Sequence, residues 1–330
     1  MKKLALVGCG GIGDYHLNHL VQFKDISLAA FCDVTLERAE KFVNKADQGK
    51  AFTDFNTMFD EIKPDMLFIC VPPTSHGSIE FEAIKRGIPF FVEKPVAIDL
   101  ELAKEIKNQV ETHKLISAAG FQCRYDTMNE AAKKYIRENP ILVVQASRVG
   151  GIPPISWWSN KFTSGGQLLE QTIHQMDMLR YLLEAEPETV YSVAKRGFIS
   201  QDECPGYFTD DLSTTLITFK NGVTATMMTG CYAKNNACWE SKMTFGARDS
   251  RMDYMLVNKL TVYTKEQAEA TETSREFGLV CDRTFVDAVL TGDSSKIRSP
   301  YSDAYKSTVF AIACNKSMES GLPVNVKDLL

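Results

Sequence analysis

A glycine-rich segment that follows a short apolar run near the start of the chain constrains the fold more than any other feature. The run Lys3–Val7 has the composition of a β-strand, and Gly8-Cys9-Gly10-Gly11-Ile12-Gly13 follows it with the spacing G-x-G-x-x-G. A helical pattern comes next, so the order is strand, glycine turn, helix. In that order Gly8 permits a tight turn, Gly10 lets the backbone approach a pyrophosphate, and Gly13 lets the helix pack against the strand. The alternative is a glycine turn without a ligand. Such a turn does not need to stand between a strand and a helix, as this one does.

The start of that helix predicts a dinucleotide site. Its free N–H groups and positive dipole end favour phosphates, so Gly11 and Ile12 are expected to contact the cofactor as well. Asp33 follows the second predicted strand, where a carboxylate would accept hydrogen bonds from ribose hydroxyls and repel a 2′-phosphate. NAD is therefore predicted over NADP. Arg38 is close enough in sequence to weaken this preference, although a surface arginine without a role is the simpler interpretation.

The first 121 residues alternate between apolar runs and helical patterns. Helical stretches such as Ser75–Arg86 and Asp99–His113 separate the predicted strands Lys3–Val7, Ile26–Cys32, Lys50–Phe52, Asp65–Val71, Ile88–Val92 and Lys114–Phe121. Strands separated by helices predict right-handed βαβ units and a doubly wound parallel sheet. We therefore expect an α/β Rossmann domain over residues 1–121.

The pattern changes after residue 122. Helices are predicted near 126–138, 166–184, 279–291 and 302–320, and alternating strand patterns over Leu142–Val149, Thr189–Phe198, Leu212–Phe219, Val223–Gly230 and Trp239–Phe245. Asn221-Gly222 between two of these runs predicts a β-hairpin. Residues 122–330 are thus expected to form an α+β domain with a mainly antiparallel sheet.

Composition excludes several classes of protein. The 330 residues are 44% hydrophobic and carry a formal charge of −5 without a Lys/Arg cluster, which argues against a nucleic-acid partner. The longest apolar run, Met66–Pro73, is much shorter than the roughly 20 residues of a membrane span. The nine cysteines are scattered without a C-x-x-C pair, so we expect neither disulfides nor a metal site, and a reducing, cytoplasmic location.

Two motifs stand at the expected carboxyl edge of the parallel sheet. Val71-Pro72-Pro73-Thr74-Ser75-His76 ends one strand, and Pro72, Thr74 and His76 are candidate cofactor contacts, with Thr74 or Ser75 as a helix N-cap. A histidine that merely starts a helix is the alternative for His76.

The second motif is Phe90-Phe91-Val92-Glu93-Lys94-Pro95. A lysine beside a cationic nicotinamide would have a lowered pKa, which suits proton transfer, and Pro95 favours an extended backbone at Lys94. Glu93 and Lys94 are therefore candidate cofactor or catalytic residues, unless they are simply solvated charges at a strand end.

A third cluster lies in the predicted helix 166–184. At helical spacing Glu170, His174, Asp177 and Tyr181 would form a polar stripe beside an apolar face. A carboxylate one turn before a histidine can orient the ring and raise its basicity. An exposed acid–histidine pair is the commoner alternative. Trp157 and Trp158 closely precede this helix and could stack against a sugar ring or pack in an interface.

Together these motifs resemble the Gfo/Idh/MocA family (glucose–fructose oxidoreductase, inositol dehydrogenase and rhizopine catabolism proteins). The resemblance rests on the glycine turn, on Val71–His76, on Glu93-Lys94-Pro95 and on the Gly165–Asp177 segment. Two further segments are also similar to the family pattern, namely Gly120-Phe121-Gln122-Cys123-Arg124-Tyr125 and Ser320-Gly321-Leu322-Pro323-Val324.

The resemblance implies a Rossmann domain followed by an open-faced sheet domain, and a homodimer or homotetramer formed through the sheets. It makes Lys94 and His174 the catalytic pair. Glu170 stands where aspartate is usual, and Thr172 where many members have glycine, so both positions put the substrate in doubt. The expected substrate contacts are Arg124, Trp157, Trp158, Thr172 and Asp177.

The resemblance favours reversible hydride transfer between NAD and a secondary alcohol of a sugar, inositol or related polyol. Lys94 is expected to meet Glu170 and His174 across the cleft between the two domains. The alternatives are a redox-assisted glycosidase that holds NAD tightly, and a non-catalytic NAD-sensing regulator, against which the presence of Lys94, Glu170 and His174 together argues.

Overall fold

A computed structural model describes residues 1–234, 237 and 241–330 of the chain. The chain forms two compact units. The first contains Met1–Tyr125 and Glu276–Tyr305, and the second contains Asp126–Arg275 and Lys306–Leu330. The domain boundary expected from the sequence assigns all residues after 121 to the second domain, whereas residues 276–305 pack with the first unit.

The first unit is built on a six-stranded sheet with strand order β3-β2-β1-β4-β5-β6, in which all pairs are parallel. The order reverses between β1 and β4, as in dinucleotide-binding folds. The strands are β1 (Lys2–Val7), β2 (Ile26–Cys32), β3 (Lys50–Phe52), β4 (Met66–Ile69), β5 (Phe90–Val92) and β6 (Ser117–Ala119). The helices are α1 (Gly11–Leu20), α2 (Leu36–Ala46), α3 (Phe55–Ile62), α4 (Ser78–Lys85), α5 (Leu100–Thr112) and α9 (Phe277–Thr291). The predicted doubly wound parallel sheet is confirmed.

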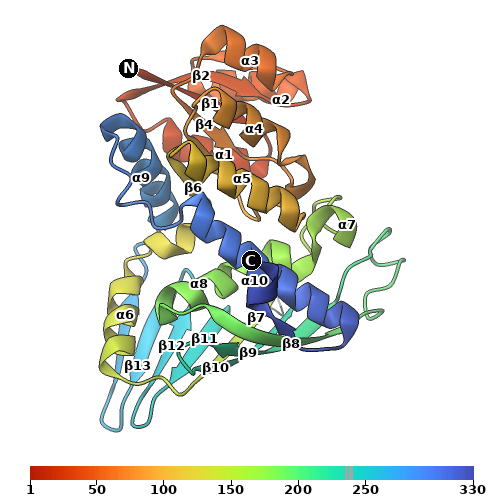
Figure 1. Cartoon of the computed structure of the whole chain (residues 1–330), viewed down its shortest axis with the longest axis vertical. Helices are drawn as coiled ribbons and strands as arrows, with labels where there is room; N and C mark the ends of the chain where they lie inside the picture. The colour runs from red at the N-terminus through yellow and green to blue at the C-terminus, as the bar shows by residue number, and fades with distance from the viewer. Residues whose placement is uncertain (235–236, 238–240) are drawn as a thin grey trace. The chain divides into compact units, whose positions relative to one another are not determined.

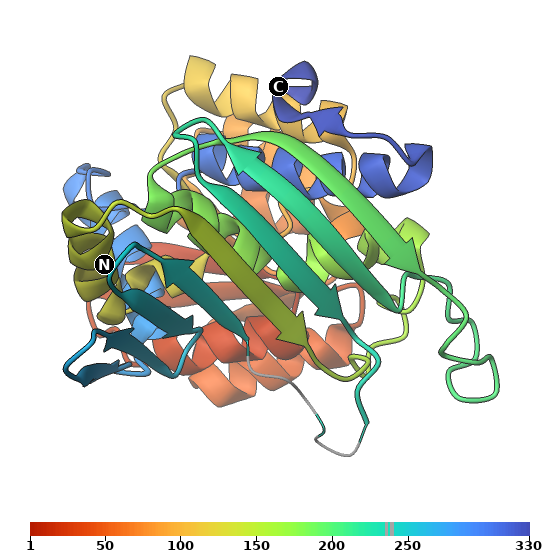
Figure 2. The ribbon, with the colours of Figure 1, turned by 90° about the horizontal axis from the view of Figure 1, so that it is seen from below.

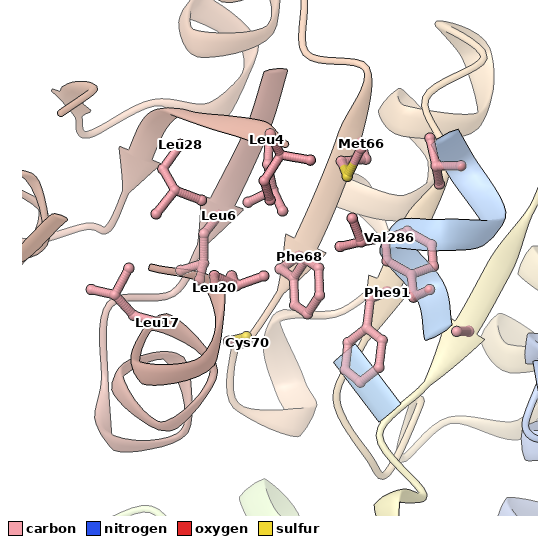
Figure 3. Close-up of a cluster of buried hydrophobic side chains, with 14 of the residues drawn as sticks. Leu4, Leu6, Leu17, Leu20, Leu28, Met66, Phe68, Cys70, Phe91 and Val286 are labelled. Atoms are coloured by element: carbon pink, nitrogen blue, oxygen red, sulfur yellow. The ribbon is translucent and has the colours of Figure 1, made fainter. Parts of the chain in front are cut away.

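Helix α9 completes the core of this sheet, although it comes from the end of the chain. Figure 3 shows Val286 beside Phe68 and Phe91, and Leu17 and Leu20 of α1 belong to the same cluster. All five side chains are fully buried. Burial of one such side chain contributes about 1.5–3 kcal/mol, so 276–305 is an integral part of the first unit.

The start of α4 differs from the sequence prediction. Thr74 and Ser75 lie in a short 3-10 turn (η1, Pro73–Ser75), and the N-cap of α4 is Gly77, so the prediction that Thr74 or Ser75 caps this helix was wrong. Gly77 has a φ of 117°, which disfavours any side chain at the cap. Glu80 then accepts a hydrogen bond from the backbone N–H of Gly77 at 2.6 Å.

The second unit contains a nine-stranded sheet with order β14-β13-β12-β11-β7-β10-β9-β8-β15. Only β7 and β10 pair in parallel among its described strands. The strands are β7 (Val143–Val149), β8 (Pro187–Lys195), β9 (Leu212–Phe219), β10 (Thr224–Gly230), β11 (Lys242–Gly246), β12 (Arg251–Met255), β13 (Lys259–Tyr263), β14 (Ala268–Glu272) and β15 (Val324–Asn325). The mainly antiparallel sheet is confirmed, and so is the hairpin at Asn221-Gly222, where Gly222 has a φ of 86°.

The helices of this unit are α6 (Met128–Glu138), α7 (Lys161–Ser164), α8 (Ile173–Leu183) and the C-terminal part of α10 (Tyr301–Ser320), which are labelled in Figure 1. The prediction of strand from Trp239 falls partly outside the described residues, and β11 begins at Lys242. Strands β12 to β15 were not predicted. Among the described residues, no helix is long and apolar enough to cross a membrane.

One face of the second sheet is open. Figure 2 shows this face toward the viewer, with helices of the unit on the other side. Cross-strand pairing places Tyr191 beside Leu216, and these two, Val193 and Val143 are exposed by between 40% and 50%. Several threonines complete the face. Apolar side chains of this size on an uncovered sheet are typical of a subunit interface.

We therefore expect the protein to be a homodimer or homotetramer that associates through this sheet face. Leu216→Lys should place a charge in the centre of the interface and shift the population toward monomer, as measured by light scattering at micromolar concentration. Leu322→Lys, at an exposed position outside the sheet, is the matched control and should leave the mass unchanged. A wild-type monomer at that concentration would contradict the prediction.

Candidate functional site

The glycine turn between β1 and α1 has the steric properties that a dinucleotide requires. A Cβ on Gly8 would lie 2.2 Å from the carbonyl oxygen of Cys70, and one on Gly13 would lie 2.1 Å from that of Gly8. Gly10 and Gly11 instead face open space, with no atom within 4 Å of such a Cβ. Gly10 is the N-cap of α1 and supplies no side-chain partner to the first N–H groups. The turn therefore offers an uncovered helix N-terminus, which fits a pyrophosphate.

Asp33 lies at the carboxyl end of β2, directly beside this turn. Its carboxylate accepts hydrogen bonds from the backbone N–H of Cys9 at 2.9 Å and of Thr35 at 3.0 Å. Arg38 comes no closer than 3.9 Å and is mostly exposed. Asp33 thus links the turn to β2 and still presents acceptor oxygens, because each carboxylate oxygen has two lone pairs.

The segment Pro72–His76 follows β4. Pro72 is half-buried and Thr74 is exposed, whereas His76 is buried with its Nδ1 2.6 Å from Glu80 Oε1. Since Glu80 also binds the N–H of Gly77, His76 is held to the first turn of α4. The imidazole is therefore engaged within the protein, and Thr74 and its neighbour Ser75 are the exposed residues of this segment.

A buried polar network stands behind the Glu-Lys-Pro motif. The ring of His16 in α1 lies between two carboxylates, with Nε2 at 3.0 Å from Glu93 Oε1 and Nδ1 at 2.9 Å from Asp282 Oδ1. His19 Nδ1 contacts the other oxygen of Asp282 at 2.6 Å. Glu93 also packs directly on Gly120, where a Cβ would lie 2.1 Å from its Oε1. The Glu93 carboxylate is thus directed into the protein, toward α1 and α9.

Electrostatics determine the charge of His16. Burial alone would lower its pKa, but the charges and hydrogen bonds of Asp282 and Glu93 outweigh that effect and raise the pKa of His16 to about 10. The ring is accordingly an imidazolium at neutral pH. His16, His19 and Asp282 offer three potential metal ligands within 4.8 Å of one another. Each histidine lies 2.6 to 3.0 Å from the oxygens of Asp282, which are hydrogen-bond lengths, whereas two ligands of a tetrahedral metal stand about 3.3 Å apart.

Lys94 follows Glu93 at the carboxyl end of β5 and is half-buried. Its backbone N–H lies 3.3 Å from Glu93 Oε2, and its peptide bond to Pro95 is cis. The backbone N–H of Lys94 therefore contacts the same glutamate that forms a hydrogen bond with His16.

In the second unit the segment around Glu170 is not the regular helix that the sequence predicts. Leu168–Thr172 forms a π-helical turn (η3), and the α-helix α8 begins only at Ile173. A π-turn contains an extra residue, which changes the direction of its side chains relative to α8. The Glu170 carboxylate consequently points to Trp158, whose indole N–H donates to Oε2 at 2.7 Å. Gln171 donates to the same oxygen.

The predicted polar stripe divides into three environments. His174 is half-buried in the first turn of α8. Asp177 is buried and accepts a hydrogen bond from Ser307 at 2.6 Å, with Arg180 3.8 Å away. Tyr181 lies under the ammonium of Lys133, 3.8 Å from its ring centroid. Asp177 therefore connects α8 to α10, while His174 retains partial access to solvent.

Three other expected substrate residues are also engaged internally. Arg124 is buried in the first unit and binds the carbonyl of Arg298 at 2.6 Å and Asp303 at 2.5 Å. Thr172 is fully buried and donates to Gln167 at 3.1 Å. Trp157 is half-buried and packs beside the buried Trp158 cluster.

Sequence reasoning did not single out His16, Asp282 and Gln171, or Arg148 of β7, which donates a hydrogen bond to Gln171 Oε1 at 2.5 Å. His16 and Gln171 are close in sequence to predicted motifs, so their positions alone could have suggested a role. Asp282 lies far from the glycine turn in sequence, and only the packing of α9 reveals it. Arg148 lies 23 residues before Gln171, and only the folded structure brings its guanidinium to that amide.

Comparison with known proteins matches both halves of the chain to domains of one family. Residues 2–121 match the oxidoreductase family with an NAD-binding Rossmann fold, and residues 139–247 match the GFO/IDH/MocA C-terminal domain. The chain is 23% identical to the myo-inositol 2-dehydrogenase of Thermotoga maritima over 99% of both chains. It is 30% identical to the NAD(+)-dependent scyllo-inositol 2-dehydrogenase of Bacillus subtilis over 67% of this chain and 64% of that relative.

The fold has a similarly broad match. An oxidoreductase from Agrobacterium radiobacter, solved with NAD+, L-tartaric acid and magnesium, superposes with a TM-score of 0.87 at 19% identity over 100% of this chain and 99% of that one. The predicted NAD-binding oxidoreductase is confirmed by the family match.

Cofactor preference can be tested at Asp33. Because its carboxylate would repel a 2′-phosphate, NAD(H) should bind at least several-fold more tightly than NADP(H) in calorimetric titrations. Asp33→Ala should narrow that difference. Asp54→Ala, which removes an exposed helix cap in the same unit, should leave the ratio unchanged. Equal or tighter binding of NADP(H) by the wild type would disprove the assignment.

The charge of His16 predicts a pH dependence of stability. Its folded-state pKa is about 10 and its ordinary value is 6.5, so the stabilisation is complete below about pH 6.5 and is lost as the pH rises through 10. The wild-type melting temperature should therefore fall over that interval. His16→Gln should lower it at pH 7 and flatten the fall, since no imidazolium then separates Glu93 from Asp282.

His113→Gln is the matched control, because His113 is exposed on the same unit. It should reproduce the wild-type curve. If His16→Gln gave a curve parallel to that of the wild type, His16 would not be charged in the folded protein.

Proposed function

Because the chain belongs to the Gfo/Idh/MocA family of NAD-binding oxidoreductases, we propose that it interconverts a secondary alcohol and the corresponding ketone. The substrate class is a sugar, an inositol or a related polyol. When bound, NAD supplies the hydride acceptor. The alcohol gives up a hydride from carbon and a proton from oxygen, and the residues of this chain handle the proton.

The observation that carries this proposal is the environment of Glu170 and His174. A carboxylate held by two donors stands just before a half-buried histidine at the junction of a π-turn and an α-helix. π-turns of this kind are frequent at functional sites. The pair has the chemistry of a base and the group that orients it.

We assign His174 as the base that takes the hydroxyl proton. Lys94 binds the same oxygen and stabilises its developing negative charge. Glu170 orients His174 or the substrate. The hydrogen bonds of Glu93 to His16 and to the backbone N–H of Lys94 support the role of Lys94, because they hold the backbone from which the lysine side chain extends.

The relatives support the substrate class. Proteins that resemble this chain are named for inositols, and others for D-glucoside and glucose 6-phosphate. All of these compounds carry ring carbons with secondary hydroxyl groups. A ring polyol is therefore the first class to test.

The test begins with a panel of myo-inositol, scyllo-inositol, methyl glucosides and glucose 6-phosphate, in which NADH formation is followed by absorbance. With the substrate that reacts, Lys94→Ala, His174→Ala and Glu170→Ala should each lower kcat strongly, for a proton-transfer group by about 10²–10⁴-fold. NAD affinity should change little for His174→Ala and modestly for Lys94→Ala.

Lys85→Ala and His113→Ala, both at exposed positions of the first unit, are the matched controls and should keep wild-type turnover. Near-full turnover by both Lys94→Ala and His174→Ala would refute the catalytic assignment. Hydrolysis of a glycoside without net release of NADH would instead indicate the redox-assisted glycosidase.

A further inference from the structure

Glu170 lies at the centre of a chain of hydrogen bonds within the second unit. Arg148, near the end of β7, donates to Gln171 Oε1 at 2.5 Å and to the sulfur of Cys231 at 3.1 Å. The amide of Gln171 then donates to Glu170 Oε2, and the indole of Trp158 donates to that same oxygen at 2.7 Å. One carboxylate oxygen thus receives hydrogen bonds from two directions.

The donors are themselves immobilised. Trp158 is 1% exposed and packs in a cluster with Ile199, Tyr207 and Cys231. A ring of this size cannot move in a packed interior without opening a cavity. Gln171 is fixed at its other end by the guanidinium of Arg148, which belongs to the sheet.

This arrangement limits what Trp158 can do for a substrate. A tryptophan that stacks on a sugar ring must offer a face of its indole, whereas this one buries its ring and uses its only polar atom on Glu170. A hydrogen bond to a charged carboxylate is stronger and more directional than one between neutral groups. The contact therefore selects one position of the Glu170 carboxylate.

We propose that Trp158 and Gln171 are positioning residues that hold the Glu170 carboxylate in its working orientation, with Arg148 anchoring Gln171 to the sheet. The proposal rests on the proposed function, because it assigns to Trp158 and Gln171 an effect on catalysis that passes only through Glu170. Neither side chain is required to touch the substrate.

The first experiment measures the contact without a substrate. Denaturant unfolding of the wild type, Trp158→Phe, Glu170→Ala and the double variant forms a double-mutant cycle, in which each single variant removes one partner of the hydrogen bond. Trp158→Phe removes the N–H donor and keeps an aromatic ring. Coupling between the two sites is expected, and a cycle that closes additively overturns the proposed contact.

The second experiment measures how the contacts of Trp158 and Gln171 with Glu170 affect kcat, with the substrate identified from the polyol panel. Trp158→Phe and Gln171→Met should each lower kcat by about 10-fold to 100-fold, as expected when a reacting group is displaced by roughly 1 Å. KM should change much less than kcat. In a Glu170→Ala background the same substitutions should have no further effect, because their only route to the reaction has been removed.

Tyr207→Phe is the matched control. Tyr207 packs in the same cluster, and its hydroxyl contacts the carbonyl of Asp210 at 3.4 Å and not Glu170. It should retain wild-type kcat even if the melting temperature falls. A loss of kcat equal to that of Trp158→Phe would show that the effect is general destabilisation and would overturn the proposal.

The outcomes separate this proposal from the proposed function. If Glu170→Ala lowers kcat but Trp158→Phe and Gln171→Met do not, the positioning role is wrong and the catalytic assignment stands. If Glu170→Ala itself retains full turnover, the role of Glu170 in the proposed function fails, and the unfolding cycle still decides whether the contact exists.

Discussion

The first unit depends on one buried positive charge between two negative ones. His16 belongs to the helix that starts at the glycine turn, Glu93 ends β5 directly before Lys94, and Asp282 lies on α9. Removal of a single partner from such a group leaves a buried charge without compensation, which is strongly destabilising. The same contact therefore joins the helix that follows the glycine turn, the strand that precedes Lys94 and helix α9, which is distant in sequence.

A similar arrangement occurs in the second unit, with different chemistry. Glu170 is held by neutral N–H donors, and the positive charge of Arg148 reaches it only through Gln171. A direct salt bridge would neutralise the carboxylate and reduce its effect on a neighbouring histidine. Neutral donors fix its position and leave its charge available, which is what a group that orients a base requires.

The sequence predicted what depends on local pattern and periodicity. The parallel sheet, the glycine turn and the Asn221-Gly222 hairpin follow from runs of apolar residues and from glycines at fixed offsets. The π-turn at Leu168–Thr172 could not be foreseen, because helical periodicity assumes a constant angle per residue. The π-turn also changes the direction of Glu170 relative to His174 and Asp177, which lie in the regular helix α8. The membership of α9 in the first unit depends on long-range packing that no local pattern encodes.

The resemblance to the Gfo/Idh/MocA family also raised a question that the structure helps to answer. Glu170 stands where aspartate is usual, and its side chain has one more rotatable bond. A longer side chain is less precisely placed unless contacts remove the added freedom, at a cost in conformational entropy of the order of 1 kcal/mol. The bonds from Trp158 and Gln171 converge on a single oxygen and supply that restriction. The glutamate and its two donors are therefore best understood as one unit, in which the indole and the amide make up for the additional methylene.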